Sequence, residues 1–235
     1  MVLQEMTKIS EVLKTTSLLS GKCDSCGCRP KAFYRGERRN WCQRCIKIYE
    51  RLQSLTHERA ESIICQVVEP LYLGAVFEDL DTVLREKLYN RKPYQDVFFF
   101  GPIGTGKTYA MAAIARYYIE LGYECARINF DDFCVKVRSA MSPASKLTEW
   151  DMIKPMKDVD MLFIDDLGLR SKQETDFAYV TLYSLLNKRQ ERMLPTVISS
   201  NKDIKRLAEA FDSRIASRLS TALIIEMSGK DRRNP

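Results

Sequence analysis

The sequence predicts an α/β protein in which a small metal-held module precedes a parallel sheet with flanking helices. Two observations lead to this fold class. Short apolar runs alternate with stretches of helical character, which is the pattern of a parallel sheet covered by helices. Two Cys-x-x-Cys pairs stand close together near the N-terminus. The 235 residues suffice for one full domain and one small one.

The N-terminal module is predicted from four cysteines. Cys23 and Cys26 form one pair, and Cys42 and Cys45 form a second pair after fifteen intervening residues. Each pair can turn two sulfurs toward one point, so together they can complete a tetrahedral zinc site. A segment this short lacks the core to fold alone, and zinc would contribute directly to its stability. Buried free thiols or a redox pair are the alternatives.

The positive charge of the chain is concentrated in this N-terminal part. Of the net charge of +6, residues 1–65 supply five, with 12 Lys/Arg against 7 Asp/Glu. The basic and aromatic residues that are candidates for nucleic-acid contact are Arg35, Arg38, Arg39, Arg44, Phe33, Tyr34 and Trp41. A solvated basic face is the alternative, and a protein-docking surface is a third interpretation.

The next stretch is predicted to connect the two domains. A single helix is expected over Ile46–Val68, ended by Pro70. The predicted domains are residues 1–65 and 93–235, joined by a linker over 66–92. Residues 77–80 lie just upstream of the glycine loop described next, where a nucleotide base often rests.

A glycine loop is the strongest chemical signal in the sequence. The apolar run Val97–Phe100 predicts a buried strand, GPIGTGKT at 101–108 fits G-x-x-x-x-G-K-[ST], and Tyr109–Leu121 predicts a helix. Glycines allow a curled backbone whose N–H groups cradle phosphates, and the helix points its positive end at the anion. Lys107 is predicted to reach the terminal phosphates and Thr108 to bind magnesium. A chance match is the alternative.

A second apolar run, Met161–Ile164, ends in two carboxylates. A buried strand of this kind delivers Asp165 and Asp166 to the carboxyl edge of the sheet, where α/β proteins place ligands. Asp165 is expected to bind Mg²⁺ directly or through water, and Asp166 to orient the attacking water. An ordinary acidic turn is the alternative. The predicted nucleotide-binding residues are Gly101, Pro102, Ile103, Gly104, Thr105, Gly106, Lys107, Thr108, Tyr109 and Asp165.

The remaining elements complete the α/β pattern. They are predicted as strand Cys125–Phe130, helix Asp131–Met141, an irregular polar insert over 144–158, helix Gln173–Met193, strand Thr196–Ser200, helix Ala210–Leu219 and strand Ala222–Met227. Asn201 follows a strand tip, where its amide could bond the γ-phosphate or the attacking water; a turn-forming Asn is the alternative. Arg214 and Arg218 share one helical face, either as surface arginines or as groups offered to a neighbouring subunit's triphosphate.

In their order along the chain, GPIGTGKT, MLFIDDLG, VISSN and SRIASRL resemble the AAA+ helicase-loader family (DnaC- and DnaI-like) and the related transposition ATPase IstB. The resemblance covers roughly residues 70–235. It implies Walker A at 101–108, Walker B at 161–166, a sensor at Asn201, and an arginine finger at Arg218 with Arg214 as companion. It also implies five parallel strands in the order 5-1-4-3-2 without a C-terminal helical lid, and a sensor arginine in the closing GKDRR.

This resemblance implies an ATPase that uses ATP and Mg²⁺ and loads a hexameric DnaB-type replicative helicase onto single-stranded DNA during DNA replication. The zinc module would dock on the helicase, and the ATPase domains would assemble side by side. Most AAA+ proteins have Glu where Asp166 stands, which suggests slow, partner-stimulated hydrolysis. An IstB-like ATPase that binds duplex DNA and delivers a transposase is the alternative. A P-loop kinase and a DNA-binding module with structural ATP are further alternatives.

The expected compartment is the cytoplasm. The chain shows neither an apolar run of about 18 residues nor a secretory leader, so no membrane segment is expected. Cysteines in the cytoplasm stay reduced, which favours a metal over disulfides.

Overall fold

The computed structural model describes residues 15–17, 22–27, 33–35, 40–140, 148–168, 172–210 and 213–232. Its main part is a five-stranded parallel sheet in the order β5-β6-β7-β4-β8. The strands are β4 (Val97–Phe100), β5 (Cys125–Asn129), β6 (Met161–Asp165), β7 (Thr196–Ser200) and β8 (Leu223–Glu226). Counted from β4 along the chain, this order is 5-1-4-3-2, so the predicted α/β fold of the AAA+ type is confirmed.

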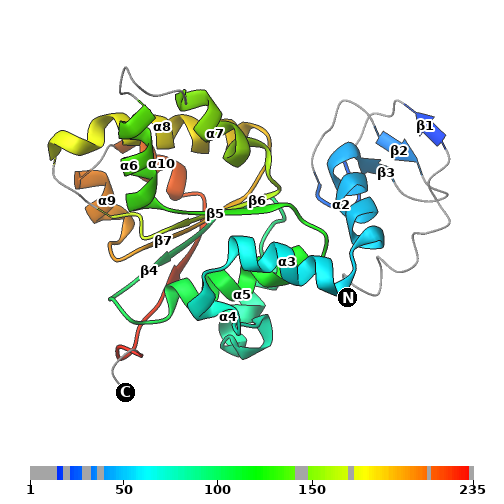
Figure 1. Cartoon of the computed structure of the whole chain (residues 1–235), viewed down its shortest axis with the longest axis horizontal. Helices are drawn as coiled ribbons and strands as arrows, with labels where there is room; N and C mark the ends of the chain where they lie inside the picture. Colours follow the sequence, from blue (N-terminus) through cyan, green and yellow to red (C-terminus); the bar gives the residue numbers. More distant parts are fainter. Residues whose placement is uncertain are drawn as a thin grey trace.

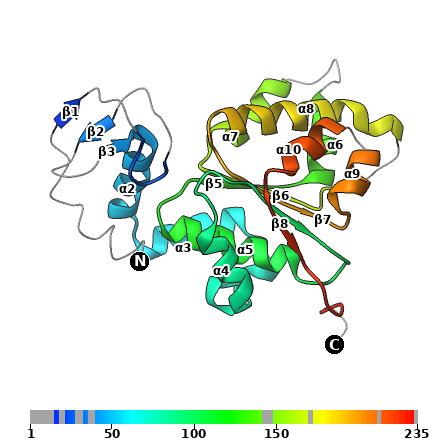
Figure 2. The same ribbon diagram turned by 180° about the vertical axis from the view of Figure 1, so that it is seen from behind.

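Helices cover both faces of the sheet (Figure 1). One layer contains α3 (His57–Val67), α4 (Thr82–Asn90) and α5 (Lys107–Glu120). The other layer contains α6 (Phe130–Ala140), α7 (Glu149–Asp158), α8 (Lys172–Glu191), α9 (Ile204–Ala210) and α10 (Ser213–Leu219). Seen from behind, the same two layers enclose the strands (Figure 2).

Alternating side chains of the central strands fill two separate cores. Phe99 and Phe163 pack against α5, whereas Phe98 and Ile164 point to the opposite side and pack under α6, α8 and α10. This alternation follows from the period of two in a strand, and burying each large apolar side chain contributes about 1.5–3 kcal/mol. The small Ala residues of α5 are buried and let this helix lie close to the sheet. The glycine loop at its start is thereby held against the sheet.

Two predictions of secondary structure are wrong, and in each case the sequence analysis missed the cap that begins a helix. The single helix expected over Ile46–Val68 is two helices, α2 (Gln43–Ser54) and α3, because the Thr56 side chain accepts a hydrogen bond from Arg59 N (3.3 Å) and starts a new helix. The insert expected over 144–158 contains helix α7, which begins with a capping box between Thr148 and Asp151.

The stretch expected as a linker is folded onto the domain that contains the five-stranded sheet. It contains the short 3₁₀ turns η1 (Pro70–Tyr72) and η2 (Phe77–Asp79) and helix α4, which Asp81 caps. Ile64, Phe77 and Leu84 are buried in the same core as α5. Because α3 also packs against α5, we propose that the boundary between the two domains lies near residue 55.

The N-terminal module is a small antiparallel sheet followed by helix α2. Strands β1 (Thr15–Ser17), β2 (Phe33–Arg35) and β3 (Asn40–Cys42) pair in that order, and each neighbouring pair is antiparallel. None of the described helices is long and apolar enough to cross a membrane.

Two arginines of α2 bind the module to the sheet domain. Arg44 Nε donates to Asp160 Oδ1 (3.0 Å) and its Nη1 to Met193 O (2.9 Å), while Arg51 bonds the other Asp160 oxygen and Gly122 O. Arg44, a candidate for nucleic-acid contact, is therefore occupied within the chain. Arg38, Arg39 and the side chain of Arg35 lie outside the described residues.

Candidate active site

The glycine loop is held in shape by its own backbone and by the end of β8. Gly101 has φ +147°, and a Cβ there would lie 2.0 Å from Met227 O, so only glycine fits beside this strand. Lys107 is buried, and its Nζ donates to Gly101 O (2.9 Å) and Pro102 O (2.7 Å). Thr105 Oγ1 also donates to Pro102 O (2.9 Å). The loop leads directly into the N-terminus of α5, which favours an anion.

The carboxylate of Asp165 stands at the end of β6 next to the glycine loop. It is 1% exposed, and its Oδ1 accepts hydrogen bonds from Thr108 Oγ1 (3.4 Å) and Asp166 N (3.1 Å). Neighbouring oxygens around an octahedral Mg²⁺, at about 2.1 Å from the ion, lie about 3 Å apart. Thr108 and Asp165 therefore fit a shared magnesium ion, as the sequence predicts.

Two further residues hold Asp165, and sequence reasoning missed both. Ser199 Oγ donates to Asp165 Oδ1 (2.5 Å) from the neighbouring strand β7, and Arg127 Nη2 donates to Oδ2 (2.5 Å) from β5. Arg127 also donates to Glu69 (2.8 Å). Burial would lower the pKa of Arg127, but its bonds to the two carboxylates outweigh burial and raise it. Both residues lie within strands, and no motif in the sequence marks either of them as a partner of Asp165.

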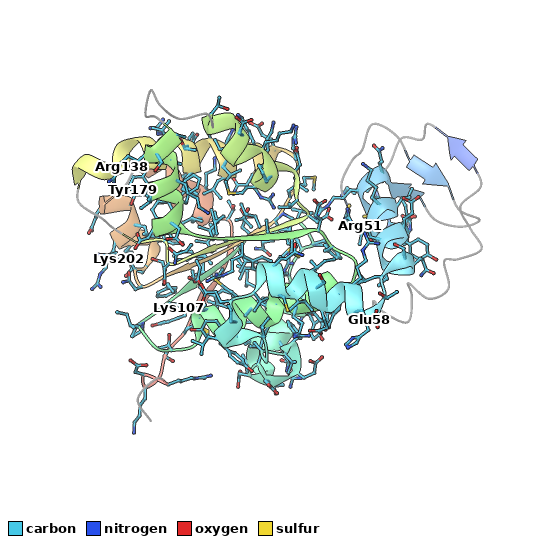
Figure 3. All side chains as sticks on the ribbon, in the orientation of Figure 1. Arg51, Glu58, Lys107, Arg138, Tyr179 and Lys202 are labelled. Carbon is cyan, nitrogen blue, oxygen red and sulfur yellow. The ribbon has the colours of Figure 1, made fainter. Side chains whose placement is uncertain are left out.

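A cleft of about 990 Å³ opens beside the loop and collects most of the predicted residues. Those that line it are Ile103, Gly104, Gly106, Lys107, Thr108, Tyr109, Asp166 and Asn201. Asp166 is exposed and has φ +53°, an uncommon backbone conformation at the end of β6 that marks functional sites. Figure 3 shows Lys107 and Lys202 at this edge of the molecule. Gly101, Pro102, Thr105 and Asp165 support the cleft through the contacts given above.

The cleft also contains residues that the sequence did not assign to it. Leu71, Tyr72, Asp131 and Lys202 line it. Phe77, expected near the nucleotide base, is instead buried and stacked on Tyr117, with ring centroids 4.6 Å apart. Leu71 and Tyr72 of η1 line the cleft, and residues 77–80 do not.

The chain after β8 crosses the glycine loop. Arg232 N donates to Gly104 O (2.9 Å), and the Arg232 side chain lines the cleft. An arginine of the closing GKDRR thus reaches the site within the same chain; Arg233 lies outside the described residues.

Arg214 and Arg218 do not line this cleft. They lie on α10 beside Tyr183 of α8, with guanidinium carbons 5.1 Å and 6.0 Å from the centre of the Tyr183 ring. Arg214 is exposed and Arg218 is half-buried. Neither arginine is therefore among the residues that line this cleft of its own chain.

The four predicted zinc ligands form one cluster. All four sulfurs lie within 4.8 Å of one another, with Cys23–Cys45 at 3.8 Å and Cys26–Cys42 at 3.7 Å. Sulfurs of a tetrahedral site at about 2.3 Å from zinc lie about 3.8 Å apart. These spacings fit zinc, and each of the four cysteines is free of disulfides.

Comparison with known proteins identifies relatives of the larger domain. The family of the bacterial DnaA ATPase domain matches residues 84–226, more than half of the chain. The replicative helicase loader DnaC of Buchnera aphidicola subsp. Acyrthosiphon pisum is 26% identical over 163 residues. That match covers 65% of this chain and 65% of the DnaC protein.

Solved structures support the same relationship. The crystal structure of the DnaI is 25% identical, with a TM-score of 0.60, over 74% of this chain and 100% of that one. AMPPCP-bound DnaA from Aquifex aeolicus has a TM-score of 0.58 over 71% of this chain and 53% of that one; its 20% identity shows the fold alone. The resemblance to DnaC- and DnaI-like AAA+ proteins is thereby confirmed.

Proposed function

This chain belongs to the family of the bacterial DnaA ATPase domain, and from that premise we propose that its cleft binds ATP with Mg²⁺ and hydrolyses it. The observation that supports this most is the convergence of Thr108 and Asp165, which are 3.4 Å apart although 57 residues separate them. With Lys107 and the glycine loop beside them, these groups suit a magnesium-bound triphosphate.

Each residue of the cleft has a distinct role in this proposal. The loop N–H groups and Lys107 bind the phosphates, and Thr108 and Asp165 hold the metal, which neutralises charge developing on the transferred group. Asp166 orients the attacking water from its exposed position, and Asn201 bonds the γ-phosphate or that water. Because aspartate is shorter than glutamate, the water is held less closely and hydrolysis is slow until a partner orders the site.

Arg218 completes the site of a neighbouring subunit, with Arg214 as its companion. A guanidinium supplied by a second copy stabilises the charge of the transition state, by analogy with other nucleotide hydrolases. Its position outside its own cleft supports this role. ATPase domains would then assemble side by side, and hydrolysis would depend on protein concentration.

We propose that the chain loads a hexameric DnaB-type replicative helicase onto single-stranded DNA. The match to a replicative helicase loader DnaC supports this role, although the matched region spans 65% of that protein's length. The zinc module, extending to about residue 55, would dock on the helicase, and the ATPase domain would bind DNA. Hydrolysis would release the loader.

An ATPase assay with and without single-stranded DNA and helicase tests the proposal. Wild type should be stimulated by both, and Lys107→Ala should lower hydrolysis on the order of a hundredfold. Arg192→Gln, which removes an exposed ion pair, is the control. Absence of stimulation by either partner would contradict the loader role. Preference for duplex DNA with capture of a transposase would support the IstB-like alternative.

A further inference from the structure

The two arginines of α10 share a single aromatic ring. Tyr183 of α8 lies half-buried at the seam between α8 and α10, which Figure 2 shows side by side. The guanidinium carbon of Arg214 is 5.1 Å from the ring centroid and that of Arg218 is 6.0 Å away. Both distances are within the range in which a cation is attracted by a ring face.

This arrangement counteracts the repulsion between two like charges. Arg214 and Arg218 are four residues apart on one helix, so their guanidinium groups face the same way and repel each other. Left to itself, each long side chain would spread over many rotamers in water. The electron-rich face of Tyr183 attracts both cations and restricts them to one region of the surface.

The backbone of Arg218 is held separately from its side chain. Its carbonyl accepts hydrogen bonds from Thr221 Oγ1 (3.0 Å) and Gln190 Nε2 (3.4 Å), and the neighbouring Leu219 is buried in the core. Because these contacts hold the backbone of Arg218, the Tyr183 ring restricts only the direction of the guanidinium. Within the described part of the chain the Tyr183 hydroxyl makes no hydrogen bond, so the ring face is the part that acts.

We propose that Tyr183 is a positioning residue that orients Arg218, with Arg214, toward the nucleotide of a neighbouring subunit. This inference rests on the proposed trans action of Arg218. A residue on α8, outside the sequence motifs, then controls how strongly hydrolysis depends on assembly. Removing the ring should lower hydrolysis about tenfold, because the arginine must then be ordered at the moment it is used. Affinity for nucleotide should not change.

Full-length variants separate the ring from the hydroxyl. Tyr183→Phe keeps the ring face and is expected to retain wild-type hydrolysis, whereas Tyr183→Leu should lose about tenfold with unchanged binding of a fluorescent ATP analogue. Tyr94→Leu, which removes another partly exposed tyrosine, is the matched control and should behave as wild type. Equal activity of Tyr183→Leu and wild type would overturn the inference, as would a tenfold loss in Tyr183→Phe.

A mixing experiment shows in which subunit the residue acts. Lys107→Ala subunits are inactive but carry an intact Tyr183 and Arg218, so adding them to Tyr183→Leu subunits should restore hydrolysis. Adding them to Arg218→Ala subunits tests the trans site itself. If added Lys107→Ala subunits restore hydrolysis to Arg218→Ala but not to Tyr183→Leu, Tyr183 does not act by orienting the arginines and the inference is wrong. If neither is rescued while wild type is active, the trans site and this inference both fail.

Discussion

Asp160 is the residue on which the docking of the zinc module should depend most. It directly precedes β6 and is buried, with a side chain 8% exposed. It accepts hydrogen bonds from Arg44 and Arg51 of α2 and from Glu124 N. We expect Asp160→Asn to weaken this docking, because the amide has one acceptor oxygen and no charge where the carboxylate has two oxygens and a full charge.

The size of the effect follows from the exposure of the partners. A hydrogen bond to a charged group contributes about 1.5–3 kcal/mol net. The Arg44 side chain is 21% exposed and that of Arg51 is 37% exposed. The Arg51–Asp160 pair is therefore partly screened by solvent and contributes less to stability. Asparagine with its oxygen at the Oδ2 position keeps the bonds from Arg51 and Glu124 N, but it loses the charge and turns its NH2 group toward Arg44, which has no acceptor left there. The expected loss in the free energy of unfolding is therefore about 2–3 kcal/mol.

Urea unfolding and limited proteolysis between α2 and α3 measure this loss. Asp160→Asn should lower the unfolding midpoint and expose the chain near Leu55 to cleavage. Asp158→Asn is the control, because its pair with Arg192 is 60% and 50% exposed and should contribute less than about 1 kcal/mol. If the two variants differ by less than about 0.5 kcal/mol and cleave equally, Asp160 does not hold the module.

Three further predictions concern stability. Cys45→Ser, or zinc chelation, should unfold the N-terminal module and leave the sheet domain folded, as checked by zinc content and proteolysis. Arg189→Met should cost about 3 kcal/mol or more in urea unfolding, since the fully buried guanidinium donates to three carbonyls and a hydroxyl. The hydrogen bond from Arg116 holds the pKa of Glu61 below its ordinary value of 4.5. The contribution of this ion pair to stability, below about 1 kcal/mol, is therefore full above that value and is lost as pH falls through the lowered pKa. The difference in unfolding between Glu61→Gln and wild type should therefore be largest at neutral pH and shrink as the solution is made acidic.

The elements with strong local signals could be predicted from the sequence. Val97–Phe100 is a continuous apolar run and Thr196–Ser200 begins with three β-branched residues, and both strands have the predicted bounds. The glycine loop has a fixed spacing, and its neighbours in the chain define its context. In each case the information lies within about ten consecutive residues, so no knowledge of the tertiary structure is needed.

The parts that could not be predicted depend on contacts between distant residues. Arg127 and Ser199 look like ordinary strand residues until β5, β6 and β7 are placed side by side around Asp165. Residues 66–92 read as a polar connection because their buried positions are sparse, and only packing on α5 shows that they belong to the core. The ring of Tyr183 on α8 contacts Arg214 and Arg218 on α10, and no pattern in the sequence predicts this contact.

The two ends of strand β6 take part in different contacts. Asp160 lies just before its first residue and binds the N-terminal module, whereas Asp165 is its last residue and stands beside the cleft. Figure 3 shows Arg51 on the side of the sheet domain opposite to Lys107 and Lys202. Because all five strands are parallel, one edge of the sheet carries the docked module and the other carries the cleft. In the proposed function, the docked module would leave the cleft open to a second copy, and a helicase bound to the module would influence hydrolysis through the sheet or through assembly.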